Sequence, residues 1–404
     1  MSYEVRPARA DEMEQIGLMS AYVYGGSFGD EADNITATSI RPEWTLCAFD
    51  GPRLITSFGA FPFTMRANGS AIAFAGVTAV GTLPEYRRQG LLRRIMTQAI
   101  ADQREQGQSV SGLWASQAAI YQRYGYAAAG TLRNYAIDTV DIRFADGDGG
   151  NCRVERVSGG QGIEFARQIY KRFIADRFGY LHRSSILWQN NIYDTESDGP
   201  VHTAVAYREG EPQGYVAYTL RSNKVNHVSR NQEIIIRDFG WLDIDAYRSL
   251  WTFLSQHDLV GRVAWASAPM DDPAMLLMQE PRLLHCNDRE GSWMRIIDVP
   301  AALAQRGYDG EGDLVIGVRG DDFAVWNNGN WRIRCDGNEA EVSSVKSDAD
   351  VELSIGALTS LYTGMCSTQQ LSSAGLISVD SAVTTGELDR LFATRYKPHC
   401  PDHY

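Results

Sequence analysis

The chain has 404 residues, a hydrophobic content of 44% and a formal net charge of −12. This length predicts two to four domains, and the acidic charge argues against a general nucleic-acid-binding protein, which needs basic patches. The six cysteines and seven histidines show no metal-ligand or disulfide spacing, so we expect no metal and no disulfide framework. Without a signal-peptide pattern, or an apolar run near the ~20 residues of a membrane span, we expect a soluble, cytoplasmic protein.

The first part of the chain predicts alternating strands and helices up to about residue 130. A strand at 3–8 precedes a helix that begins near Asp11. Three strands follow, joined by hairpins at Asp50-Gly51 and Asn68-Gly69, which are strong turn pairs. A helix after Gly90, a short strand and a second short helix complete this part.

The middle of the chain repeats that order after a Gly/Asp-rich stretch, 144–151, that predicts a linker. From about residue 290 the pattern changes to a strand, a helix with Pro300 in its first turn, several short strands and more helices. We therefore expect an α/β (α+β) protein with domains at 1–145, 146–289 and 290–404. The second domain is interpreted as a degenerate copy of the first.

Four arginines surround one glycine where a strand gives way to a helix, at Arg87, Arg88, Gly90, Arg93 and Arg94. A helix N-terminus exposes unpaired N–H groups and attracts anions. Glycine lets the backbone approach a phosphate, and arginine adds paired donors. The junction predicts a pyrophosphate site. It has neither the Walker nor the Rossmann glycine spacing, and the repeated half lacks it.

The stretch "RRQGLLRR" resembles the R-x-x-G motif of the GNAT acyl-CoA N-acyltransferases. Leu92 stands where most of that family has Gly or Ala, and this leucine is typical of one branch, the Eis (enhanced intracellular survival) acetyltransferases. The stretch "SWMRIIDVPAALAQRGY" also resembles the start of that branch's sterol-carrier-protein-like domain. The resemblance implies two tandem GNAT folds, the second degenerate, followed by a sterol-carrier-protein-like domain.

The resemblance implies acetyl-CoA as co-substrate and assigns its contacts residue by residue. The strand before the arginines would bind the pantetheine arm and the acetyl group, and the helix start would bind the phosphates. A second contact would follow the next strand, which splays away to open a slot. The implied residues are Val80, Gly81, Thr82, Arg87, Arg88, Gln89, Gly90, Leu91, Leu92, Arg93, Ser116 and Gln117.

The resemblance also implies the two groups that move protons. The family pattern S-x-x-x-I-Y-x-R-[FY]-G-Y places its catalytic tyrosine on Tyr121, whose phenol would protonate the leaving thiolate. Tyr124 and Tyr126 are interpreted as packing residues. The C-terminal carboxylate, here that of Tyr404, would serve as the base. From the residues alone a chain end is most often frayed.

The acceptor is implied less directly. The loop Ser27–Asp33 would border the acceptor site, with Phe28, Asp30 and Glu31 lining a cation-attracting pocket; the alternative is an exposed acidic loop. The resemblance implies polycationic amines such as aminoglycosides, acetylated at one or several positions, and a homo-hexameric assembly. Alternatives are a protein lysine or a biosynthetic amine as acceptor, or a lipid-binding protein with a relic GNAT domain.

Overall fold

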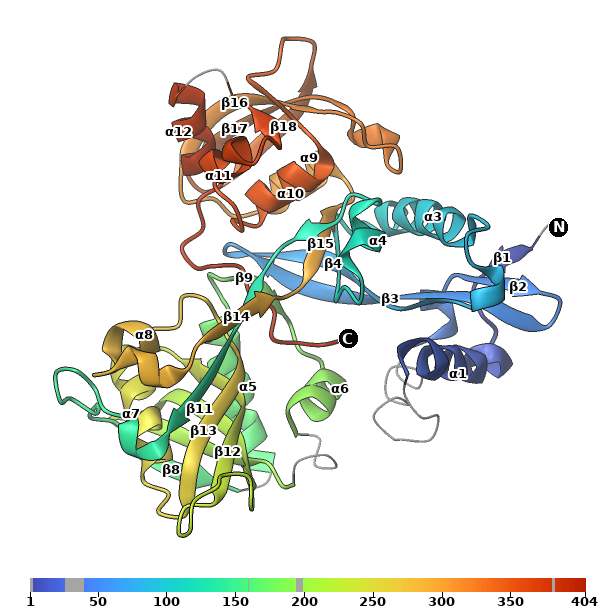
Figure 1. The fold of residues 1–404 in the computed structure, drawn as a ribbon. Coiled ribbons are helices and arrows are strands. Elements are labelled where there is room, and N and C mark those ends of the chain that lie inside the picture. Colours follow the sequence, from blue (N-terminus) through green and yellow to red (C-terminus); the bar gives the residue numbers. More distant parts are fainter. Residues whose placement is uncertain (1–2, 26–39, 159, 194–198, 380–381) are drawn as a thin grey trace. The chain divides into compact units, whose positions relative to one another are not determined.

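The computed structural model describes residues 3–25, 40–158, 160–193, 199–379 and 382–404 (Figure 1). The chain divides into two compact units. Unit 1 comprises Met1–Gly130, Gly291–Arg395 and His403–Tyr404, and unit 2 comprises Thr131–Glu290 and Tyr396–Asp402. The three domain boundaries expected from the sequence stay a prediction. In the described part of the chain, no helix is long and apolar enough to cross a membrane.

The larger sheet of unit 1 carries the arginine–glycine junction. Its strands, in spatial order, are β1 (Glu4–Arg6), β2 (Cys47–Asp50), β3 (Arg53–Ala67), β4 (Ser70–Thr82), β5 (Val110–Leu113), β15 (Trp293–Ile296) and β6 (Ala127–Ala128). Only β4 and β5 pair in parallel. The helices beside it are α1 (Met13–Tyr24), α3 (Leu91–Glu105) and α4 (Ala118–Gln122).

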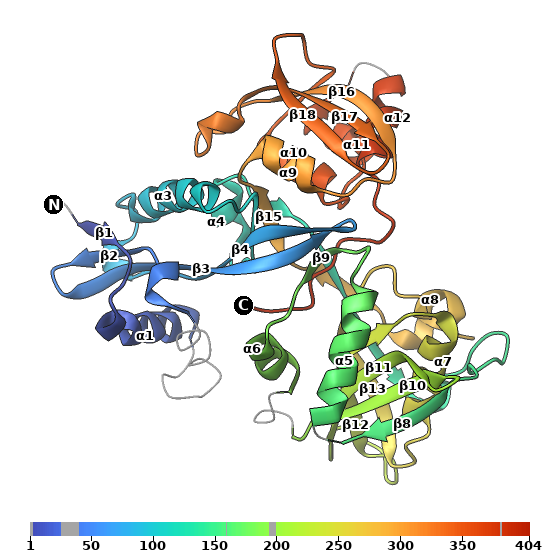
Figure 2. The same ribbon diagram turned by 180° about the vertical axis from the view of Figure 1, so that it is seen from behind.

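Helices α1 and α3 cover opposite faces of this sheet, as both views show (Figures 1 and 2). Apolar residues of α3, such as Ile95 and Met96, join one core cluster, and Ile16 and Met19 of α1 join another. The alternating side chains of the strands supply both clusters. This is the order of elements that the sequence predicts.

The hairpin between β3 and β4 is confirmed where the sequence places it. Asn68 and Gly69 take positive φ angles of 51° and 99°, which a two-residue turn between right-twisted strands requires. Both strands extend well beyond a usual strand, with 15 residues in β3 and 13 in β4. The hairpin thereby carries β4 up to the junction.

Strand β15, which the sequence analysis places at the start of the third domain, is part of the larger sheet of unit 1. Its residues pair with β5, from Trp293 opposite Leu113 to Ile296 opposite Val110, and also with β6. The segment satisfies a strand edge that would otherwise stay open.

A second sheet of unit 1 lies in the C-terminal part of the chain. Its order is β18 (Ala340–Val345), β17 (Gly329–Asp336), β16 (Glu311–Val318), β19 (Val351–Leu353) and β20 (Ile377–Ser378). The helices here are α9 (Val299–Gln305), α10 (Ile355–Tyr362), α11 (Thr368–Ser373) and α12 (Ala382–Leu391). Before β17, the buried Asp321 accepts two hydrogen bonds from Arg295 Nη2, at 2.7 and 2.8 Å.

Unit 2 repeats the arrangement. Its sheet order is β14 (Asn287–Glu290), β7 (Thr131–Asp138), β13 (Val260–Ala268), β12 (Gln232–Trp241), β11 (Glu211–Arg221), β10 (His202–Arg208) and β8 (Arg153–Val157). Its remaining elements are α5 (Gly160–Phe173), β9 (Phe178–Leu181), α6 (Ser185–Leu187), the π-helical turn Trp188–Tyr193, α7 (Ile244–Ser255) and α8 (Ala274–Leu277). As with β4 and β5, only the pair β12 and β13 is parallel.

Two details of unit 2 bear on the sequence analysis. Residues 144–151 are not a free linker, because Phe144 is buried in the core and Asp146 pairs with Arg248 of α7 at 2.8 Å. The helix start of α7 is capped by Asp243, which accepts a hydrogen bond from the Ala246 N–H at 2.9 Å. A carboxylate thus occupies the place where an anion would bind at this helix start.

Candidate active site

The site begins where β4 and β5 diverge. Their parallel pairing runs from Phe74–Val110 to Val77–Leu113 and ends there, while β4 continues to Thr82. A bulge follows at once: Ala79 has a φ of 50°, and the register with β3 shifts at this point. The pairing thus ends where the resemblance places the separation of the two strands.

The β4 residues expected to bind the pantetheine arm lie along this divergence. Val80 is half-buried, and its carbonyl accepts a hydrogen bond from the Tyr24 hydroxyl at 2.9 Å. At Gly81 a Cβ atom would stand 3.2 Å from Val23 Cγ2, so the strand runs close against α1. The Thr82 carbonyl accepts a hydrogen bond from Arg87 Nε at 3.0 Å, which joins the strand end to the arginine cluster.

The junction itself has the geometry of an anion site. Arg88 and Gly90 take left-handed φ angles of 62° and 80°, and Gly90 caps the 15-residue helix α3. A Cβ atom on Gly90 would meet nothing within 4 Å, so the helix start is open. The first-turn N–H groups point outward there, and the exposed Arg87 and Arg88 flank them. These donors suit a diphosphate such as that of coenzyme A.

The other two arginines differ in role. Arg93 lies over the Phe323 ring at 5.2 Å and stays exposed near the helix start. Arg94 points to the other side and donates from Nη1 to the Tyr3 carbonyl at 3.0 Å. Gln89 is likewise engaged, because its Nε2 donates to the Glu85 carbonyl at 3.2 Å. Three of the four arginines therefore remain for a phosphate.

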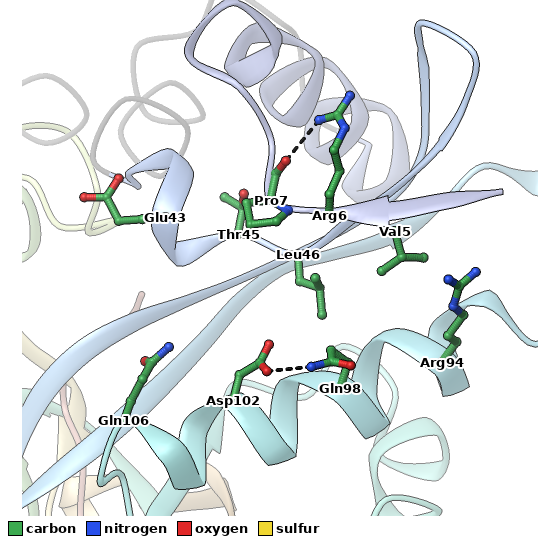
Figure 3. Close-up of a pocket in the computed structure, with 10 residues that line it drawn as sticks. All are labelled: Val5, Arg6, Pro7, Glu43, Thr45, Leu46, Arg94, Gln98, Asp102 and Gln106. Carbon is green, nitrogen blue, oxygen red and sulfur yellow. Dashed lines mark hydrogen bonds between the residues drawn. The ribbon is translucent and has the colours of Figure 1, made fainter.

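Arg94 lines a separate cavity of about 440 Å³ beside α3 (Figure 3). Gln98 and Asp102, spaced by four residues along the same helix face, also line it and are hydrogen-bonded to each other at 2.6 Å. Its far wall comes from β1 and the segment around Thr45. This cavity contains none of the residues expected to contact a co-substrate.

Tyr121 lies in α4, a helix that begins directly after the exposed residues Ser116 and Gln117. Its side chain is 4% exposed. Burial raises the pKa of Tyr121 above its ordinary value of 10, the nearby phenol of Tyr24 raises it further, and a hydrogen bond with Ser116 opposes the shift. The phenol therefore keeps its proton at neutral pH and can donate it.

The neighbouring tyrosines pack as expected. The Tyr126 hydroxyl is 2.8 Å from Ser111 Oγ inside the sheet, and the Tyr124 ring meets Phe323 edge-on at a centroid distance of 4.9 Å. Both side chains are buried.

The last two residues lie where β4 and β5 separate. The Tyr404 ring packs edge-on against Phe63, 5.2 Å between centroids. A Cβ atom on Gly76 of β4 would stand 2.5 Å from Phe63 Cε2 and 3.1 Å from Tyr404 Cδ2, so glycine leaves room for the Phe63 ring and for the terminal ring packed on it. His403 stacks on Trp114, which directly follows β5, with centroids 3.9 Å apart. The chain end is therefore packed against both diverging strands.

Three family models match successive parts of the chain: an acetyltransferase (GNAT) domain at 4–129, a second acetyltransferase (GNAT) domain at 179–296 and a sterol carrier protein domain at 299–401. An uncharacterized N-acetyltransferase of Streptomyces coelicolor is 30% identical over 349 residues, which cover 85% of this chain and 84% of that protein. The chain belongs to the Eis-type GNAT N-acetyltransferases.

Named Eis proteins and a solved structure agree with this membership. The N-acetyltransferase Eis of Mycobacterium tuberculosis is 28% identical over 333 residues, covering 79% of this chain and 78% of Eis. The crystal structure of Eis1 from Mycobacterium abscessus superposes with a TM-score of 0.84 at 25% identity, covering 100% of both chains. The protein is thus a GNAT acetyltransferase with two GNAT domains and a sterol-carrier-protein-like domain.

One group of predicted site residues lies outside the described part of this Eis-type chain, and the sequence did not predict one residue that the structure places at the site. Phe28, Asp30 and Glu31 fall outside the described residues. Tyr24 was not predicted, although its hydroxyl lies at the Val80 carbonyl and its phenol neighbours Tyr121. The only local signal is its place at the end of an amphipathic helix, which is too common to single it out.

Proposed function

We propose that this enzyme transfers the acetyl group of acetyl-CoA to amines of polycationic small molecules such as aminoglycosides, at one or several positions. The observation that carries the proposal is that the anion cradle, the diverging strands, Tyr121 and the chain end all belong to unit 1. The net charge of −12 and the acidic residues Asp30 and Glu31, beside Phe28 in the sequence, favour a cationic acceptor.

The residues take successive roles in binding. The β4 backbone at Val80, Gly81 and Thr82 holds the pantetheine arm, since β5 pairs with β4 only as far as Val77 among the described residues. The phosphates contact the helix start, and the wall beyond β5 adds further contacts. The residues proposed for these contacts are Arg87, Arg88, Gln89, Gly90, Leu91, Leu92, Arg93, Ser116 and Gln117.

The chemical step then balances as follows. The Tyr404 carboxylate accepts a proton of the acceptor ammonium through a water molecule, or it orients the amine while water takes the proton. A water molecule is invoked because a free carboxylate, with a pKa of only ~3.5, is a weak base. The amine nitrogen bonds to the acetyl carbon, and the carbon–sulfur bond breaks. Tyr121 gives its proton to the departing thiolate. The nitrogen loses its second proton as the amide forms, the Tyr121 phenolate takes one proton back, and the Tyr404 carboxylate passes the other to solvent, so that one proton is released in each turnover. The assembly is a homo-hexamer in the cytoplasm, by resemblance to Eis proteins.

The test measures thiol release from acetyl-CoA with aminoglycosides, a lysine peptide and simple diamines as acceptors. We expect turnover with aminoglycosides, and a loss of about 10²–10⁴-fold in kcat for Tyr121→Phe, the usual contribution of a general acid. Tyr124→Phe removes another buried phenol, one whose ring packs on Phe323, and serves as the matched control. Turnover only with peptides would reassign the acceptor. Full activity of Tyr121→Phe would remove the acid from the mechanism.

A further inference from the structure

The degenerate GNAT domain in unit 2 keeps the strand divergence of an active GNAT domain. Its parallel pair, β12 and β13, stays in register only as far as Ile236 opposite Trp265. A register shift follows in β12 before Asp238, just as Ala79 follows Val77 in β4. The second copy has therefore lost its phosphate site at Asp243 but kept the slot between its strands.

The tail segment 396–402 packs in this slot on the β13 side. The His399 N–H donates to the Phe178 carbonyl at 3.0 Å, and its ring Nδ1 lies 3.3 Å from the Thr131 carbonyl. The ring also bonds to the backbone of Ser267, beyond the last β13 residue that pairs with β12. At Gly179 a Cβ atom would stand 2.7 Å from the His399 carbonyl, so the tail backbone lies tightly against this segment.

The same tail is held on the β12 side by a buried ion-pair network. Arg183 Nε donates to Asp402 Oδ1 at 2.7 Å, and both side chains are 0% exposed. The other two guanidinium nitrogens of Arg183 bond to the Asp238 carboxylate, with Nη2 to Oδ1 at 3.2 Å. One arginine thus links β12 to the second residue before the chain end.

Such a buried network adds little to the free energy of unfolding. Taking an arginine and two carboxylates out of water costs free energy that apolar packing would avoid, and buried ion pairs are better at fixing one geometry. The group whose position matters is the carboxylate of Tyr404, two residues after Asp402. The slot offers no anion site, since Asp243 caps the helix that would bind a phosphate.

We propose that the degenerate domain has become a holder for the chain's own C-terminal segment. Its vacated strand divergence binds residues 396–402, and Arg183 is a positioning residue that fixes Asp402 and, through it, the terminal carboxylate. This assignment rests on the proposed function of Tyr404 for its catalytic consequence, but not for the holding of the tail itself.

The experiment compares Asp402→Asn with the wild type by two measurements. Carboxypeptidase A releases a C-terminal aromatic residue only when the chain end leaves its seat, so the rate of tyrosine release reports tail holding without reference to catalysis. We expect Asp402→Asn to raise this rate and to lower kcat by about 10-fold or more each, the effect of losing a charged hydrogen bond, with the KM for acetyl-CoA unchanged. Asp245→Asn removes a carboxylate paired with Arg208 elsewhere in unit 2 and should change neither.

Further variants separate the outcomes. In a chain lacking Tyr404, Asp402→Asn should lower kcat no further, because both changes act through one group. Gly179→Ala should free the tail without removing a charge, and it covers the case in which Asp402→Asn does not fold. If Asp402→Asn and Gly179→Ala both release tyrosine at the wild-type rate, the proposal that unit 2 holds the C-terminal segment is refuted. Faster release with unchanged kcat in Asp402→Asn would overturn the positioning role, and full activity without Tyr404 would overturn the proposed base instead.

Discussion

His399 provides a quantitative test of how the tail is held in unit 2. The ring is 2% exposed, and burial lowers its pKa from 6.5 to about 4. Arg177 opposes its protonation, whereas Asp238 and the carbonyl groups of Thr131 and Ser267 favour it. The folded protein therefore keeps this ring neutral at a pH where the unfolded chain already protonates it.

The sign and size follow from this difference. Between pH 6.5 and 4 the unfolded state binds the extra proton, so the stability that the neutral ring contributes is complete above pH 6.5 and is lost as the pH falls toward 4. At 1.36 kcal/mol per pKa unit the whole window is worth about 3 kcal/mol, of which about 2 kcal/mol is lost between pH 7 and 5. Asp272, whose pKa burial raises to about 6, has the opposite sign and must be separated.

The separation comes from His399→Gln, which does not titrate and leaves Asp272 in place. Urea unfolding at pH 7 and pH 5 should give a loss of stability about 2 kcal/mol larger in the wild type than in the variant. A ¹³C-histidine NMR titration of the wild type should place one of the seven histidines near pH 4. Equal pH dependence of the two proteins, or no histidine titrating below pH 5.5, would refute the reasoning.

Three more changes probe unit 1. Arg87→Gln should raise the KM for acetyl-CoA by about 10-fold or more, since it removes a charged donor. Arg94→Gln should leave the KM unchanged, because the Arg94 side chain bonds to the Tyr3 carbonyl instead. Equal KM values in the two variants would show that Arg87 does not bind the phosphates. Gly76→Ala places a Cβ atom 2.5 Å from Phe63 Cε2 and 3.1 Å from Tyr404 Cδ2, so it displaces the Phe63 ring on which the terminal ring packs. It should lower kcat more than Gly386→Ala, whose methyl group meets open space, and similar kcat values would contradict the packing of the chain end on β4. Arg295→Met strands the buried Asp321 and should cost about 3–5 kcal/mol in thermal unfolding, whereas an unchanged melting temperature would show the pair to be dispensable.

The local parts of the fold were predictable because local residues determine them. The Asn68-Gly69 turn needs two positive φ angles, and few residue pairs other than Asn-Gly adopt them readily. The anion site needs only a strand, a turn and a helix start that are adjacent in sequence. The lack of the arginine–glycine junction in the second copy was visible too, since the stretch 238–250 stands where the arginines would be.

The long-range parts were not predictable from the same patterns. The apolar pattern of β15 predicts a buried strand but does not show which sheet the strand joins. Its partner β5 lies more than 100 residues earlier, on the other side of unit 2 in the sequence. Arg183 pairs with Asp402 across 219 positions, and nothing in the spacing of charged residues marks that pair. Tyr24 gains its place at Val80 only when α1 packs on the sheet.

The central claim, that the terminal carboxylate acts as the base, is tested most directly by removing its charge alone. An enzyme made by ligating a synthetic C-terminal peptide that ends in Tyr404 amide keeps the ring against Phe63 and loses only the carboxylate. The account predicts a fall in kcat of about 10²-fold or more, with acetyl-CoA binding unchanged, relative to the same ligation product with a free acid. Equal kcat values for amide and acid would contradict it.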